Sequence, residues 1–150
     1  MRNKIIHIAF AILSCLPMFA FSASFKVYPG ARLESINEPK QSDFDVKTSK
    51  APKVIIFTTY DPFDTVVAFY RGTGREYRMP GSNGKPSKLS SGQEVKEAYF
   101  ILDNAADLNT SKHWIKIQWP YLTKWGFQER FEKTRNVTAI IEEDKRSYKD

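Results

Sequence analysis

Cysteine and histidine are scarce in this chain of 150 residues, which contains one cysteine and two histidines. A single cysteine cannot form a disulfide within the chain or build a zinc site from several thiolates. Cys15 and His7 both lie in the first 22 residues, so the remainder has no cysteine and only His113. Zinc sites with two or three histidines are thereby excluded, and no calcium-loop pattern of spaced aspartates occurs. We expect no metal and no cofactor.

Long apolar runs are also missing, except at the N-terminus. Residues 5–16 are almost entirely apolar, follow Arg2 and Lys4, and end at Pro17. This pattern, with small residues up to Ser22, is typical of a cleaved secretory signal peptide. We therefore expect a signal peptide at 1–22, a single mature domain at 23–150, and a periplasmic or secreted location. The run is too short for a membrane anchor, so no transmembrane segment is expected in the mature chain.

Cys15 leaves an alternative open. It follows Ile12, Leu13 and Ser14, which loosely resembles the site at which bacterial lipoproteins are lipidated. Leu13 is bulky where that motif prefers a small residue. The alternative function that would follow is a lipid-tethered structural subunit of an envelope complex.

Acidic residues are outnumbered, with 17 Asp and Glu against 23 Lys and Arg, giving a formal charge of +6. Arg2 and Lys4 contribute two of these charges and would leave with the signal peptide. Most of the remaining excess lies in a segment rich in glycine and proline, which we expect to be a mobile basic loop at about 72–92. Arg75 and Arg78 in this loop, and Arg71 immediately before it, are its basic binding candidates. Export makes nucleic acid an improbable partner, so an anionic envelope component, a glycan or an acidic protein is expected instead.

Hydrophobic periodicity predicts an α+β fold. Phe63, Val66, Val67 and Tyr70 follow helical spacing, which predicts one principal helix over about 62–71, with Asp61 as its N-cap. Strand-like patterns occupy 53–59, 75–79, 94–102, 112–119 and 138–141. Helices do not alternate with these strands, so we expect the helix to pack on an antiparallel sheet of about four to six strands. The segment 127–135 fits either a hairpin or a helix, and the residues from Glu142 onward are expected to form a charged tail.

Alternation within residues 112–119 separates two faces. His113, Ile115 and Ile117 share the apolar face, whereas Trp114 and Lys116 lie on the polar one. An exposed tryptophan is a binding platform for sugars or apolar ligands, so Trp114, Lys116 and the nearby Trp125 are ligand-binding candidates.

His113 is expected to be a core residue with a hydrogen-bond partner. The alternative is that it serves a small hydrolase, paired with Asp103 or Asp107 and a serine. No strand-to-helix elbow of the G-x-S-x-G type presents such a serine. The protein is therefore expected to be a binding domain rather than an enzyme.

Three stretches resemble small exported bacterial proteins of unknown function. They are VYPGARL at 27–33, TTYDPFDTVVAFYR at 58–71 and EAYFILDNAADLNTSKHWIKIQ at 97–118. In those proteins a YPGA start is followed by the strand-helix motif T-x-D-x-F-x-x-V-v-x-FY. The resemblance implies an envelope location and one strand-helix-sheet domain, and it brings no activity and no catalytic residue.

Overall fold

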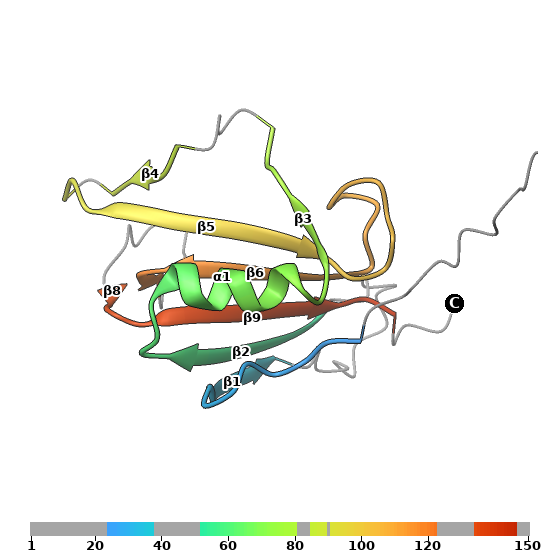
Figure 1. The fold of residues 1–150 in the computed structure, drawn as a ribbon, viewed down its shortest axis with the longest axis horizontal. Coiled ribbons are helices and arrows are strands. Elements are labelled where there is room, and N and C mark those ends of the chain that lie inside the picture. The colour runs from blue at the N-terminus through green and yellow to red at the C-terminus, as the bar shows by residue number, and fades with distance from the viewer. Residues whose placement is uncertain (1–23, 38–51, 81–84, 90, 123–133, 147–150) are drawn as a thin grey trace, which may run out of the picture.

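The computed structural model describes residues 24–37, 52–80, 85–89, 91–122 and 134–146. Within these residues, one helix and nine strands follow one another (Figure 1). Their bounds are β1 Arg32–Asn37, β2 Lys53–Thr59, α1 Phe63–Arg71, β3 Arg75–Tyr77, β4 Ser87–Lys88, β5 Glu94–Ile101, β6 His113–Trp119, β7 Tyr121–Leu122, β8 Thr134–Arg135 and β9 Thr138–Asp144.

Seven of the strands form one sheet, in which every pairing is antiparallel. The order is β1-β2-β9-β6-β5-β3, and β4 also pairs with β5. The α+β class is confirmed, but the expected four to six strands were too few. The residues expected to form the basic loop contain β3, which falls within the strand predicted at 75–79, and also β4, whose two residues are too few to show a period. Of the ambiguous segment 127–135, Thr134 and Arg135 form β8, and residues 127–133 lie outside the described residues.

Helix α1 covers the middle of one face of this sheet, over β5 and β6. It begins and ends where the sequence predicted, and it buries Val66, Val67 and Tyr70. The predicted cap is wrong, because the N-cap position is Pro62 and makes no side-chain bond. The Asp61 carboxylate instead accepts a hydrogen bond of 2.7 Å from the Tyr28 hydroxyl, which ties the N-terminal segment to the start of the helix.

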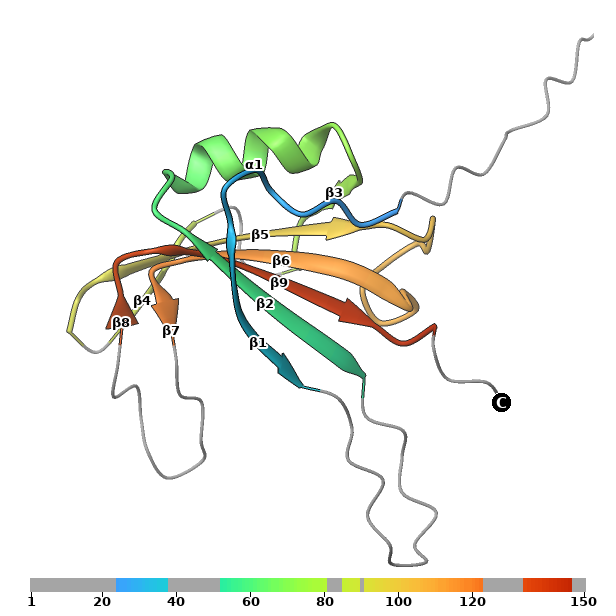
Figure 2. The ribbon, with the colours of Figure 1, turned by 90° about the horizontal axis from the view of Figure 1, so that it is seen from below.

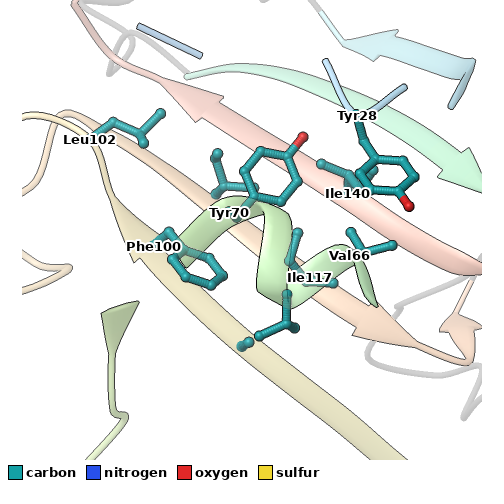
Figure 3. Packing of buried hydrophobic residues seen from close by; sticks show 10 residues of the cluster. Tyr28, Val66, Tyr70, Phe100, Leu102, Ile117 and Ile140 are labelled. Atoms are coloured by element: carbon teal, nitrogen blue, oxygen red, sulfur yellow. The ribbon is translucent and has the colours of Figure 1, made fainter. Parts of the chain in front are cut away.

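The main core lies between α1 and the sheet. Figure 3 shows Tyr70 pointing from the helix toward the sheet, near Phe100, and the two ring centroids are 6.1 Å apart. The Tyr70 hydroxyl donates to the backbone oxygen of Lys26 at 2.9 Å, so this buried polar group is satisfied. Ile117 and Ile140 are fully buried beneath the helix. These contacts hold the helix and the N-terminal segment on one side of the sheet.

The opposite face of the sheet carries no described helix. The short β7–β8 pair projects from this side (Figure 2). A small second cluster of Tyr121, Val137 and Ala139 lies at the base of that pair. No helix in the described part of the chain is long and apolar enough to cross a membrane. The face opposite α1 is therefore where side chains of β5 and β6 reach the surface.

Candidate functional site

Trp114 and Tyr99 lie side by side on the face opposite α1. The predicted alternation of β6 is present: Trp114 is partly exposed, whereas His113 and Ile115 beside it are fully buried. Tyr99 comes from β5, and its ring centroid is 6.3 Å from that of Trp114, at an interplanar angle of 45°. Two aromatic rings therefore lie together at one place on the sheet. The sequence predicted Trp114 there but not Tyr99.

Lys116 lies on the same face, but its ammonium group already forms an ion pair within the protein. Its ammonium lies 2.6 Å from the carboxylate of Glu97 and 5.8 Å from the Tyr99 ring centroid. Glu97 also accepts hydrogen bonds from the Tyr99 hydroxyl at 3.1 Å and from the Gln118 amide at 3.0 Å. Burial would raise the pKa of Glu97, but these donors, with Lys116 foremost, hold that pKa below its usual value. Lys116 was predicted to bind ligand; in the structure its ammonium is held by Glu97 and lies over the Tyr99 ring, so it positions these two side chains.

A groove adjoins this face at the outer edge of β5. It has a volume of about 480 Å³ and shares Glu97 and Tyr99 with the aromatic face. It reaches from the first turn of α1 to the chain around β3 and β4. Its remaining lining residues are Phe63, Asp64, Glu76, Tyr77, Arg78, Met79, Lys85, Pro86, Ser87, Val95, Lys96 and Ala98.

The pairing of the edge strands explains where the groove lies. β3 pairs with β5 over residues 99–101, and β4 pairs with it over residues 94–95. Between them, no described strand pairs with residues 96–98 on this side. After Tyr77, the last residue of β3, the chain moves away from β5, and it pairs with β5 again at Ser87, the first residue of β4. The groove lies beside β5 between these two pairings.

The acidic side chains of the groove are all paired with cations. The shortest distances are 3.8 Å between Asp64 and Lys96, 2.8 Å between Glu76 and Arg71, and 2.6 Å between Glu97 and Lys116.

Two cations of the groove have no such partner. Within the described ranges, Arg78 and Lys85 form no ion pair, and both are exposed. Tyr77 and Pro86 lie beside them in the lining. The charge of Arg78 contributes to lowering the pKa of Glu76, but neither Arg78 nor Lys85 is held in an ion pair, so the groove combines two exposed cations with apolar and aromatic walls.

The other predicted arginines are engaged within the molecule. Arg71 binds Glu76 through its Nε atom at 2.8 Å, and this pair raises the pKa of Arg71 and lowers that of Glu76. Arg75 donates to the carbonyl oxygens of Ala105 and Ala106. Trp125 lies outside the described residues. Of the predicted basic residues, only Arg78 lines the groove, and Lys85 joins it there.

His113 does not form the triad that a hydrolase would need. Its side chain is fully buried, and its Nε2 lies 2.9 Å from Glu142 rather than from an aspartate. The Asp103 carboxylate and the Ser111 hydroxyl both accept from the backbone N–H of His113, at 3.1 and 3.3 Å. Asp107 binds the backbone and hydroxyl of Thr110. The ring pairs with neither Asp103 nor Asp107, as the hydrolase alternative required, and His113 is the buried, hydrogen-bonded core residue that was expected.

His113, Glu142 and Asp144 form a polar cluster that the sequence did not reveal. One ligand-type atom of each lies within 4.8 Å of the others, the only such trio among the described residues. Both carboxylate oxygens of Asp144 are held by Arg146, at 3.0 and 2.8 Å, which lowers the pKa of Asp144. A metal bound at the Nε2 of His113 would also leave a protonated Nδ1, which has no hydrogen-bond acceptor within the described structure. The cluster thus consists of two neighbouring pairs, His113 with Glu142 and Asp144 with Arg146. Strand β9 continues to Asp144, where a charged tail was expected.

Comparison with known proteins adds no relative: no family model matches the chain, and no curated protein or solved structure matches it significantly.

Proposed function

We propose that the protein is a small exported binding domain whose ligand site is the β5 groove together with the adjoining rings of Tyr99 and Trp114. The observation that carries this proposal is that Arg78 and Lys85, neither of which forms an ion pair within the described chain, lie in one groove with apolar walls. Arginine and lysine side chains in that state attract anions, and aromatic rings bind apolar or ring-shaped groups. The ligand class that fits both is an anionic envelope component with an apolar or cyclic part.

A hydrolytic function has less support. The single histidine of the described chain is enclosed, and the groove contains no histidine or cysteine. Its serine, Ser87, has no base in the lining, because Glu76 and Glu97 are held in ion pairs. Binding therefore accounts for the groove better than catalysis does.

Export is supported by the N-terminal pattern described above and by the resemblance to small exported bacterial proteins. Mass spectrometry of the protein recovered from cells tests it directly. A chain that begins at or near Ala23 is the expected result. A chain that begins at a lipidated Cys15 would favour the tethered subunit instead, and an intact Met1 would contradict export.

Binding is tested with three probes: phosphatidylglycerol vesicles, polyglutamate and an anionic polysaccharide, each followed by intrinsic tryptophan fluorescence. The change is Arg78→Ala with Lys85→Ala, and we expect about tenfold weaker binding of the probe that the groove accepts. The matched control is Lys26→Ala with Arg32→Ala, which removes the same charge from exposed positions that do not line the groove. Equal losses in the two variants would mean that only overall charge matters. Absence of binding to all three probes would refute the proposal.

A further inference from the structure

Strand β1 forms the edge of the sheet farthest from the groove, and it exposes two large apolar side chains. Leu33 and Ile36 are 56% and 48% exposed. No described strand pairs with the outer side of β1. Soluble proteins usually protect such an edge with charges, a proline or a bulge. β1 does contain a bulge, but the bulge brings its apolar side chains together.

The register of β1 with β2 shows how the bulge brings Leu33 and Ile36 to the same face. Leu33 pairs with Phe57 and Ile36 with Ile55, and the register shifts between Leu33 and Ser35. Phe57 and Ile55 are two residues apart and therefore share a face, which is the α1 face because Phe57 packs against the main core. Leu33 and Ile36 must then share that face as well, although three residues separate them. A regular strand would place them on opposite faces.

The two residues between them point the other way. Ser35 pairs with Ile56, whose side chain lies on the face opposite α1. The Glu34 carboxylate reaches the Thr58 hydroxyl and Arg135 on that same face. Leu33 and Ile36 therefore lie on the α1 face, and Glu34 and Ser35 between them lie on the opposite face. This order of faces is the same whether the strand is followed from residue 33 to 36 or from 36 to 33.

We propose that β1 pairs antiparallel with β1 of a second copy of this chain, with Leu33 opposite Ile36 of the other copy. This register places Glu34 opposite Ser35 and matches the face of every side chain from 33 to 36. A shift by one residue in either direction sets an apolar side chain against a polar one on the wrong face, and one of these shifts also opposes the two Glu34 carboxylates. The contact is self-complementary, as a two-fold dimer requires. It joins the two sheets at the edges remote from the grooves, so both ligand sites stay open.

Sedimentation velocity on the purified protein, in the form processed by its expression host, tests the association. We expect a concentration-dependent dimer. Leu33→Lys should raise the dimer dissociation constant by about tenfold or more, because it places a charge where an apolar contact forms. Tyr60→Lys is the matched control, since Tyr60 is 81% exposed and lies beyond the end of β2. A protein that stays monomeric at all concentrations overturns the proposal, as does a dimer that both variants weaken equally.

Oxidative cross-linking tests the register itself, in a Cys15→Ser background. Leu33→Cys combined with Ile36→Cys should give a disulfide-linked dimer. Either cysteine alone should not, because in this register each lies three positions, about 10 Å, from its own copy across the contact. Efficient cross-linking by a single cysteine overturns the register. This proposal is independent of the ligand site, so its failure would leave the proposed function standing.

Discussion

Asp103 should hold the turn between β5 and β6 together, and Asp103→Asn tests this. One carboxylate oxygen accepts from the backbone N–H groups of Lys112 and His113, and the other accepts from the Ser111 hydroxyl and the Ala105 N–H. An amide keeps one acceptor oxygen, loses the charge, and turns an NH2 group toward donors. Hydrogen bonds to a charged group contribute about 1.5–3 kcal/mol each, so we expect the free energy of unfolding at pH 7 to fall by about 3 kcal/mol.

The direction of the pKa shift of Asp103 determines how its stabilising effect changes with pH. Burial would raise the pKa of Asp103, but the hydrogen bonds from Lys112, Ser111 and their neighbours outweigh burial and lower it. The folded protein thus binds the proton less readily than the unfolded chain. The stabilisation is present above the unfolded pKa, near 4, and is lost as the pH falls through the folded value.

Urea unfolding of both proteins from pH 7 to pH 3 measures the effect. The difference between wild type and Asp103→Asn should be largest at pH 7 and shrink toward pH 3. The control is Glu94→Gln, whose carboxylate is 51% exposed and lies 4.0 Å from Lys88, and which should change stability by less than about 0.5 kcal/mol. A difference that stays constant with pH, or that is below about 1 kcal/mol at pH 7, would refute the reasoning.

Two further substitutions probe the packing around α1. Gly74→Ala would place a Cβ atom 2.7 Å from Cδ2 of the buried Leu102, and thermal unfolding should show a loss of about 1–2 kcal/mol. Gly72→Ala is its control, since the nearest atom there is 3.5 Å away, and an equal loss in the two variants would argue against the packing explanation. Tyr70→Phe removes the 2.9 Å bond to the Lys26 carbonyl, and the urea midpoint should reveal a loss of about 1 kcal/mol. An unchanged midpoint would show that this bond does not contribute.

The features that the sequence predicted correctly are local and periodic. The spacing of Val66, Val67 and Tyr70 depends only on helix geometry, and the alternation through Trp114 depends only on the pleat of a strand. Both patterns repeat several times within one element, so a single sequence displays them. The same local reasoning misplaced Asp61, because its real partner, Tyr28, lies 33 residues away.

The candidate site was only partly predictable because it depends on register. Trp114 was chosen for its place in the strand alternation and Arg78 for its charge, but Tyr99 and Glu97 became visible only when β5 was paired with β6. The groove exists because β3 and β4 pair with different parts of one strand, and no sequence pattern reports that offset. Arg71 and Arg75 were also predicted to bind ligand, but the fold places Arg71 in an ion pair and Arg75 on backbone carbonyl oxygens, and the sequence shows neither contact.

The position of β9 has a consequence for the time course of folding. This strand comes after all the others along the chain, yet it lies between β2 and β6 in the interior of the sheet. The half that contains β1 and β2 therefore cannot join the half that contains β5 and β6 until residues 138–144 are in place. Sheets assembled from distant segments form slowly, and a chain that emerges N-terminus first has to wait for its last strand. Such a delay leaves the sheet incomplete during synthesis, and an incompletely folded chain is the state in which a polypeptide with the export signal proposed above would cross a membrane.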